Sequence, residues 1–365
     1  MHVVCLDVPY PPDYGGAMDI YYRIECLQKL GFDLSIHVFE YGRGKQKKLE
    51  EFGSVFYYKR NFSLWLHFSK TPFIVRSRKN RSLLENLLID TSPILFEGIH
   101  TTYFLNHPKL LNRQTFVRTH NIEHEYYHQL GIYSNSVIKR FFFRLESIKL
   151  RVFEQQLINA HTILAIKSED VNHFKNINSN VKLLPASISK ELAAFRETKK
   201  MALFHGNLSV IENENAVYKI HQLIKNELSE FFDFVVAGKN PTQKLTQFCT
   251  EHGIILIQNP SVDEMNNLIS DARIHLFQTD FDSGVKLKLL KSINSCGHIL
   301  TAQNLIFDSE ISELCHVVND ENQFISRFKQ LKNDSLSFAD FEIRMEFLRA
   351  YFLREKEIIS TLFEN

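Results

Sequence analysis

The chain has 365 residues, of which 44% are hydrophobic and 23% charged, and its formal net charge at pH 7 is +1. That length suits two α/β domains better than one core, and the composition excludes a largely disordered chain. The sequence has no apolar run long enough for a membrane span, and its five cysteines form no C-x-x-C pair that would indicate a thiolate metal site. We therefore expect a cytoplasmic globular protein with reduced thiols.

The charge is divided unevenly along the chain. Residues 1–200 contain 28 Lys and Arg against 19 Asp and Glu, whereas residues 201–365 contain 15 against 23. A basic half beside an acidic half is typical of a protein that meets anionic lipid or another polyanion, and it also arises by ordinary variation. Charge alone leaves both interpretations open.

The chain begins with an apolar strand at residues 3–8, followed by the loop PYPPDYGG, a helix at 17–30 and a second strand at 33–39. Gly15 and Gly16 lie where this loop enters the helix, whose unpaired N–H groups suit an anionic ligand; a simple tight turn is the alternative. The two glycines lack the G-x-G-x-x-G spacing, so a nicotinamide enzyme is disfavoured even though Glu40 closes the second strand.

Residues 54–81 mix basic and aromatic side chains. This mixture predicts either an edge that faces a membrane or polyanion, or an ordinary strand followed by a solvated helix. The residues concerned are Trp65, Phe68, Phe73, Arg76, Arg78, Lys79 and Arg81. A further strand at 93–99 follows, with Glu97 and His100 near its end.

The strand at residues 115–119 is followed by an H-x-x-E-H sequence at His120, Glu123 and His124. This spacing matches the inverted zinc-peptidase motif, which needs both histidines and the glutamate on one helix face. Because a strand precedes His120, we expect that residue at a strand-to-helix turn, with the two imidazoles pointing apart. His120 is then better placed to donate to an oxygen or to move a proton, and a zinc peptidase stays as an alternative.

The remaining pattern alternates strands and helices. In the first half a helix is predicted at 136–160, then strand 162–166, helix 168–175, strand 181–185 and a charged linker at 191–200. In the second half strands are predicted at 202–204, 232–237, 254–257, 274–279 and from 298, with helices at 213–228, 242–252 and 262–273. This rhythm predicts an α/β fold of two facing, doubly wound Rossmann-like domains, 1–190 and 201–337, around a central cleft.

The stretch from Ile274 to Thr301 attracts the strongest functional hypothesis. It reads as a strand, a polar turn closing on Gly284, a helix that carries Lys286, Lys288 and Lys291, and another strand. Open parallel sheets bind ligands at the carboxyl ends of their strands, and the following helix N-terminus favours negative charge. We therefore expect an anionic ligand there.

The order of YPPDYGGA, LFEGIH, RTHNIEHEYY, LFHGNLS, GKNP, NPSVDEM and SGVKLKLLKSINSCG resembles bacterial glycosyltransferases of the GT-B fold, close to the retaining family-4 group. The similarity spans nearly the whole chain. It includes a helix at 338–352, within the segment 338–365, of the kind that crosses back to the first domain in this fold.

The resemblance implies a retaining transfer of a hexose, with mannose as a candidate, from a nucleoside diphosphate sugar to a growing surface glycan or lipid-linked acceptor. The first domain would hold the acceptor, with Gly15 and Gly16 near the donor phosphates and His120 close to the transferred sugar. The second domain would hold the donor through Gly206, Asn207, Gly238, Asn259, Glu264, Asp282 and Gly284.

The sequence also departs from that group. Asn207 stands where relatives often have arginine, and Lys291 stands where the second of two glutamates would fall, so the carboxylate that usually holds the ribose is missing. Lys286, which we prefer, and Lys288 are candidates to stabilise the leaving diphosphate. Asp280, Asp282 and Glu264 remain equal candidates for the ribose.

The partners that follow are a nucleotide-sugar donor, a glycan or lipid-linked acceptor and an anionic membrane, with no nucleic acid. We expect no cofactor and no required metal, because side-chain cations and helix N-termini can neutralise a diphosphate. The protein would work in the cytoplasm, at the inner face of the plasma membrane if its acceptor is lipid-linked. The alternative suggested by Asn207 and Lys291 is a catalytically silent partner subunit of another transferase.

Overall fold

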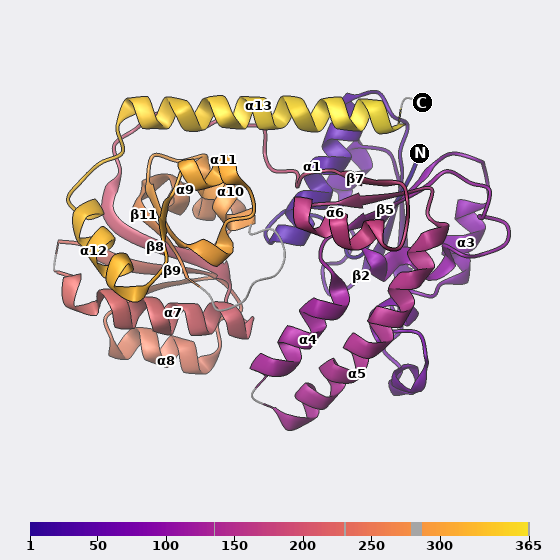
Figure 1. Ribbon diagram of the computed structural model, residues 1–365, viewed down its shortest axis with the longest axis horizontal. Coiled ribbons are helices and arrows are strands. Elements are labelled where there is room, and N and C mark those ends of the chain that lie inside the picture. The colour runs from indigo at the N-terminus through magenta and orange to yellow at the C-terminus, as the bar shows by residue number, and fades with distance from the viewer. Residues whose placement is uncertain (135, 230, 279–286, 364–365) are drawn as a thin grey trace.

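The computed structural model describes residues 1–134, 136–229, 231–278 and 287–363. The chain forms two parallel sheets, each flanked by helices, and the long helix α13 (Phe338–Phe363) runs across both (Figure 1). The predicted fold class of two Rossmann-like doubly wound units is confirmed. No helix among the described residues is both long and apolar enough to span a bilayer.

The first sheet has seven parallel strands. Their spatial order is β3 (Ser54–Lys59), β2 (Ser35–Glu40), β1 (His2–Cys5), β4 (Ile94–Glu97), β5 (Thr115–Thr119), β6 (Thr162–Ala165) and β7 (Val181–Leu183). In β1, Val3 and Cys5 face one apolar cluster and Val4 faces another, so both faces of the sheet are buried. The strand order reverses between β1 and β4, which is where such sheets place ligands.

Along the chain, the helices of the first unit connect these strands. They are α1 (Gly15–Lys29), α2 (Phe73–Arg76), α3 (Arg81–Leu87), α4 (Glu123–Tyr133), α5 (Val137–Glu154) and α6 (Ser168–Lys175), with 3₁₀ turns η1 (Lys47–Glu51), η2 (Leu64–Phe68), η3 (Ile99–Phe104) and η4 (Gln155–Asn159). Helices α4 and α5 pair with each other and extend away from the sheet (Figure 1).

The second sheet has six parallel strands. Their order is β10 (Ile255–Gln258), β9 (Asp233–Lys239), β8 (Lys199–Asn207), β11 (Ala272–Phe277), β12 (His298–Ala302) and β13 (His316–Val318). Its helices are α7 (Ile211–Ile224), α8 (Gln243–Glu251), α9 (Val262–Asp271), α10 (Leu287–Ile293), α11 (Ser309–Glu313) and α12 (Glu321–Leu331), with 3₁₀ turns η5 (Lys225–Glu227) and η6 (Gln303–Leu305). Strand β8 begins at Lys199, inside the stretch predicted as linker, because its first residues pair with β11.

The first helix begins earlier than predicted. Gly15 and Gly16 form the first turn of α1 instead of the preceding loop, and neither has a positive φ. A Cβ atom at Gly15 would lie 3.4 Å from Leu287 Cδ1 of α10 in the second unit. The start of α1 and α10 are therefore in van der Waals range of each other at this point.

Helix α13 joins the two hydrophobic cores. Its first half packs through Phe341, Met345 and Leu348 in an apolar cluster that belongs mainly to the second unit and also includes Met18 and Ile166 of the first. Its last turns pack against the first unit through Ile359 and Leu362, which is why the helix continues beyond the predicted end at residue 352.

A buried ion pair fixes α13 to the first unit. Arg23 Nη1 of α1 lies 2.9 Å from Glu355 Oε1, and both side chains are fully buried. The Arg23 guanidinium also donates to the Pro185 carbonyl, and Ser187 Oγ hydrogen-bonds to the Glu355 carboxylate. Removing one partner from such a pair leaves an uncompensated charge in the interior.

We expect Glu355→Ala to lower the free energy of unfolding by roughly 3–5 kcal/mol, because the buried Arg23 would keep only Asp19 as a counter-charge, which lies 3.7 Å away and already pairs with Arg118. Urea unfolding followed by circular dichroism measures this change. The matched control is Glu310→Ala, which removes the ion pair between Glu310 of α11 and Arg354, a neighbour of Glu355 on α13. These two side chains are 52% and 46% exposed, so the free energy of unfolding should fall by less than about 1 kcal/mol. Equal losses of unfolding free energy in the two variants would show that the buried Arg23–Glu355 pair does not fix α13 to the first unit.

Candidate active site

The carboxyl ends of the two sheets face each other. Asp13 follows β1 of the first sheet and Lys239 ends β9 of the second, and the Lys239 ammonium forms an ion pair with the Asp13 carboxylate. Arg43 binds the same carboxylate and donates to the Pro11 carbonyl at 2.8 Å. The ligand-binding edges of both sheets are thereby brought to one region.

His120 occupies the first sheet's side of this region, directly after β5. Its Nε2 lies 3.0 Å from Glu97 Oε2, at the end of β4, and its Nδ1 lies 3.8 Å from Asp19 Oδ2 of α1. The side chain is 12% exposed, whereas Glu97 is fully buried. Two carboxylates therefore fix the orientation of an imidazole that still reaches the surface next to the strand-order reversal.

These carboxylates are themselves held by arginine. Arg118 of β5 forms an ion pair with Asp19, and its Nη1 lies 3.7 Å from Glu97 Oε2. Burial raises the pKa of Asp19, but Arg118 and Arg23 outweigh burial, so this pKa lies below its ordinary value. Asp19 therefore stays ionised. The sequence pattern pointed to Glu97 but not to Asp19 or Arg118. The available signal for these two was a charged residue inside an otherwise apolar helix or strand.

The H-x-x-E-H sequence does not form a metal site. His120 bonds Glu97, whereas His124 Nδ1 lies 2.7 Å from Glu154 Oε2 on α5. Glu123 is buried, which raises the pKa of its carboxyl to about 7, and it accepts a hydrogen bond from Asn121. The zinc-peptidase hypothesis is therefore wrong, because the strand before His120 turns the two histidines toward different carboxylates.

A different group could hold a metal ion. The Glu154 oxygen that accepts from His124 also lies 3.5 Å from His173 Nε2 of α6, and one ligand atom from each of the three residues lies within 4.8 Å of the others. As the structure stands, these contacts tie α4, α5 and α6 together through one buried carboxylate.

On the second sheet's side, two glycines let β8 and β9 lie close together. Gly206 pairs with Gly238, and a Cβ atom at Gly238 would lie 1.8 Å from the Gly206 carbonyl oxygen. Asn207 ends β8, and its carbonyl accepts a hydrogen bond from Asn213 Nδ2 at 2.9 Å. This edge borders β11, the other strand at the order reversal of the second sheet.

Lys288 joins this group from α10. Its Nζ donates to Asn213 Oδ1 at 3.1 Å and lies 4.7 Å from the ring centroid of Phe204. Lys291, one turn further along, is largely buried, and burial lowers the pKa of its ammonium to about 8. The structure thus brings Gly206, Asn207 and Lys288 together with one cation already fixed in place.

Two other predicted donor residues, Asn259 and Glu264, have structural roles elsewhere in the second unit. Asn259 has a positive φ of 51°, and its Oδ1 accepts a hydrogen bond from the Asn240 backbone at 2.8 Å. Glu264 closes a capping box with Ser261 at the start of α9, and those hydrogen bonds lower the pKa of its exposed carboxyl. Both side chains support local structure. Lys286, Asp280, Asp282 and Gly284 lie outside the described residues.

The aromatic and basic segment divides into two parts. Trp65 and Phe68 of η2 are 81% and 83% exposed. Arg78, predicted for the same surface, is instead buried, because its Nε donates to the Leu6 carbonyl at 2.9 Å and its Nη1 to the Ile74 carbonyl at 2.6 Å. Burial lowers the pKa of this guanidinium to about 9.

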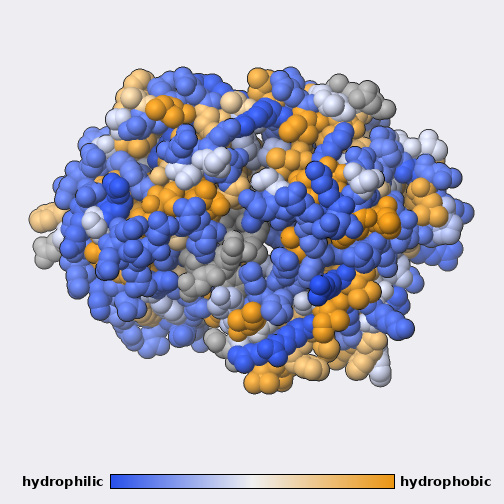
Figure 2. Space-filling view, viewed as in Figure 1, coloured by the Kyte–Doolittle hydropathy of each residue, from blue (hydrophilic) through white to orange (hydrophobic). Residues whose placement is uncertain are grey.

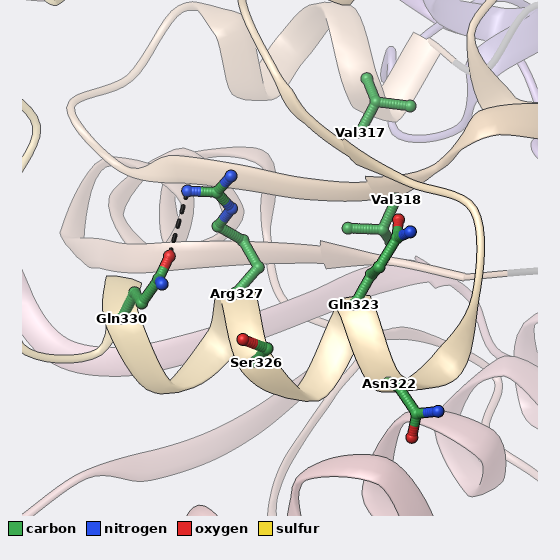
Figure 3. Close-up of a pocket in the computed structure, with 7 residues that line it drawn as sticks. All are labelled: Val317, Val318, Asn322, Gln323, Ser326, Arg327 and Gln330. Carbon is green, nitrogen blue, oxygen red and sulfur yellow. Dashed lines mark hydrogen bonds between the residues drawn. The ribbon is translucent and has the colours of Figure 1, made fainter.

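A separate hollow lies on the outer edge of the second sheet, between β13 and α12 (Figure 3). Its lining residues come from one strand and one helix, and Arg327 Nη1 donates a hydrogen bond to Gln330 Oε1 at 3.1 Å. β13 is the edge strand furthest from β9, so this hollow is not part of the site between the sheets.

No family model matches the sequence. An uncharacterized 44.6 kDa protein in the cps region of Klebsiella pneumoniae is 24% identical over 92% of this chain and 94% of its own length. Among solved structures, Anabaena HepE in complex with UDP and glucose covers the whole of both chains with a TM-score of 0.67 at 10% identity. An α,α-trehalose-phosphate synthase (UDP-forming) from Burkholderia vietnamiensis matches 99% of this chain and 96% of its own with a TM-score of 0.63 at 12% identity.

The chain is therefore a protein of two Rossmann-like units whose ligand-binding edges face each other. Its fold is the GT-B glycosyltransferase fold, as the sequence resemblance predicted.

We expect Glu154→Gln to lower the melting temperature more at pH 6 than at pH 8.5. The Glu154 carboxylate, 3.5 Å from His173 Nε2, raises the pKa of His173 above its ordinary 6.5, so that stabilisation is complete below 6.5 and is lost as pH rises through the raised value. Burial raises the pKa of Glu154, but both histidines outweigh it and the pKa falls below 4.5, so this contribution is lost as pH drops below that value.

The contribution of the cluster is therefore largest between about 4.5 and 6.5. The melting temperatures of wild type and variant, measured at pH 6 and at pH 8.5, give this contribution at each pH. Glu310→Gln, whose partner is an arginine, is the control and should show no difference between pH 6 and pH 8.5. A loss for Glu154→Gln that is independent of pH would contradict an ionic role.

Proposed function

We propose that the protein is a retaining glycosyltransferase that moves a hexose, with mannose as one candidate, from a nucleoside diphosphate sugar to a growing surface glycan or lipid-linked acceptor. One observation carries the proposal. His120, held beside two carboxylates, and Lys288, held beside Gly206 and Asn207, stand on the facing edges of the two sheets, and open parallel sheets generally bind ligands at such edges.

The donor would lie on the second unit. Breaking the bond between the sugar C1 and the diphosphate oxygen leaves negative charge on that oxygen, and a preorganised cation in a desolvated site stabilises the charge. Asn213 holds Lys288 in place as this cation. Lys291 adds a second amine, which is largely removed from water by burial. The new bond then forms between C1 and the acceptor oxygen, and the acceptor proton leaves with the diphosphate.

The acceptor would lie on the first unit, beside Arg60 and Arg78, neither of which forms an ion pair with a carboxylate among the described residues. Among the described residues, no carboxylate lies within 4.0 Å of the Arg78 guanidinium. Arg60 donates to Ser77 Oγ at 2.9 Å and stacks over the rings of Tyr41 and Phe62. A phosphate-bearing acceptor, such as a lipid-linked pyrophosphate, would supply the missing negative charge.

Two of the relatives support this proposal. The Klebsiella relative is described by its place in a cps region, and the Anabaena structure contains UDP and glucose. We therefore propose UDP as the first donor nucleotide to test, capsule or surface polysaccharide as the product class, and the inner face of the plasma membrane as the place of work. Asn207 and Lys291 keep the silent partner subunit as the second candidate, because both replace residues that the resembling enzymes use.

The first test is nucleotide binding. We expect one of UDP, GDP or ADP, or its sugar, to raise the melting temperature in the presence of EDTA, since a ligand that binds only the folded state stabilises it. The silent-partner alternative predicts no turnover with any donor, and that a neighbouring transferase becomes active when this protein is added. The absence of a shift with any nucleotide would overturn the transferase and favour the silent partner subunit.

Lys288→Ala tests the donor site. Losing one cation beside the diphosphate should weaken binding of the nucleoside diphosphate at least tenfold, because a charge-assisted hydrogen bond contributes about 1.5–3 kcal/mol. Isothermal titration calorimetry measures the change. Lys225→Ala, at the exposed start of η5 directly after α7, is the matched control and should bind like wild type. Unchanged binding in Lys288→Ala would remove this lysine from the donor site.

His120→Ala tests the reaction itself. Release of sugar from the donor should slow by about 10²–10⁴-fold, the usual contribution of a positioned acid or base, while nucleotide binding stays within a few-fold of wild type. The rate of nucleoside diphosphate release measures the first quantity. His128→Ala, an exposed histidine of α4, is the control. A parallel loss of nucleotide binding would show that His120 supports the fold and does not act on the sugar.

A further inference from the structure

Helix α5 has two apolar faces, and only one of them is used inside the protein. Leu150 and Phe153 are buried with the carboxylates Glu146 and Glu154 on the face toward the first sheet. A second set of large apolar side chains is between 41% and 83% exposed, and it consists of Val137, Ile138, Phe141, Leu145, Ile148 and Val152.

The spacing of this second set makes it one continuous stripe. Residues 138, 141, 145, 148 and 152 are separated by three or four positions, so they lie on a single side of the helix. In Figure 2 hydrophobic residues gather over the lower end and along the length of α5, bordered by strongly hydrophilic ones. An exposed apolar area of this extent marks an interaction surface.

The charge around the stripe has one sign. Arg140, Arg144 and Arg151 are exposed on α5, whereas its two acidic residues, Glu146 and Glu154, are buried on the opposite face. Within α5, which is described throughout, the exposed side therefore carries cations and no carboxylate. Apolar side chains flanked by arginine and lysine are the pattern of helices that lie in the interface of an anionic bilayer.

The 3₁₀ turn η2 extends the same surface. Lys149 Nζ donates to the His67 carbonyl at 2.7 Å, and the His67 ring meets the Phe142 ring edge-on at 5.3 Å. Phe142 and Lys149 each stand four positions after Ile138 and Leu145, so η2 lies along the edge of the stripe. Leu64, Trp65 and Phe68 of η2 are at least 77% exposed.

We propose that α5 and η2 form a docking surface for an anionic lipid bilayer, into which the stripe and Trp65 insert while the cations contact lipid phosphates. A second copy of this chain is a poorer fit, because two such surfaces would bring together arginines without acidic partners. The proposal rests on the proposed function for its purpose: Arg60 and Arg78 flank η2 in sequence, so a lipid-linked phosphate held by them would enter from the same side.

The test uses the intact protein and its single tryptophan. With phosphatidylcholine vesicles that contain about a third phosphatidylglycerol, Trp65 emission should shift to shorter wavelength and be quenched by lipids brominated on the acyl chains. The protein should sediment with these vesicles, and its affinity should fall at least tenfold in pure phosphatidylcholine or at high salt. No sedimentation and no emission shift at low salt would overturn the proposal.

Phe141→Ser with Ile148→Ser tests the stripe. The double variant should bind vesicles at least tenfold more weakly while keeping the wild-type melting temperature, since both side chains are more than 60% exposed. Ile343→Ser with Leu353→Ser, on the exposed side of α13, is the matched control and should bind normally. Equal binding by the stripe variant and wild type would overturn the proposal.

Arg144→Gln with Arg151→Gln tests the charge, with Arg349→Gln and Lys356→Gln on α13 as its control. Only the α5 pair should weaken binding and reduce its salt dependence. Sedimentation velocity tests the other occupant: a wild-type dimer that the stripe variant converts to monomer, with vesicle binding unchanged, would overturn the bilayer in favour of a second copy.

These outcomes are separable from failure of the proposed function. Vesicle binding is measured without a donor, and nucleotide binding by the stripe variant is measured without lipid. A protein that binds vesicles through α5 but neither binds nor turns over any nucleotide-sugar would refute the transferase and leave the docking surface in place.

Discussion

A buried network of charges connects the far end of the chain to the candidate catalytic histidine. Glu355 of α13 pairs with Arg23, Arg23 and Arg118 hold Asp19, and Arg118 and His120 share Glu97. Each of these ions is costly to bury alone, so each is tolerated only because the next one neutralises it. The orientation of His120 therefore depends in part on the packing of the last turns of α13 against the first unit.

The second side of the site is built by different means. There the backbone shapes the site, because Gly206 and Gly238 allow two strands to approach without side chains between them. Asn213 hydrogen-bonds both the end of β8 and Lys288, and so holds Lys288 at the strand end. A diphosphate needs N–H groups and a cation more than it needs a particular carboxylate. The second unit therefore presents a fixed cation beside a closely packed backbone, and the proposed donor site relies on these in place of the glutamate that the resemblance places at Lys291.

The proposed acceptor and the proposed membrane contact come from one short part of the chain. Arg60, η2 and Arg78 follow each other, and η2 is fixed to α5 through Lys149 and His67. An enzyme that extends a lipid-linked glycan must hold a phosphate near the bilayer while its donor arrives from water. A first unit with a net positive charge and a second with a net negative charge fits that division, since only the first would approach anionic lipid.

The sequence by itself determined the alternation of strands and helices, the two parallel sheets, the position of His120 after a strand and the basic, aromatic character of the first half. These are local properties, because hydrophobic period, glycine and proline act within a few residues of where they stand. Tertiary structure alone decided which charges meet. The pairing of Arg23 with Glu355, the separation of His120 from His124, the burial of Arg78 and the use of Glu264 in a helix cap all depend on segments that packing brings together or holds apart. An electrostatic site is set by distances in space, and no spacing in the sequence specifies them.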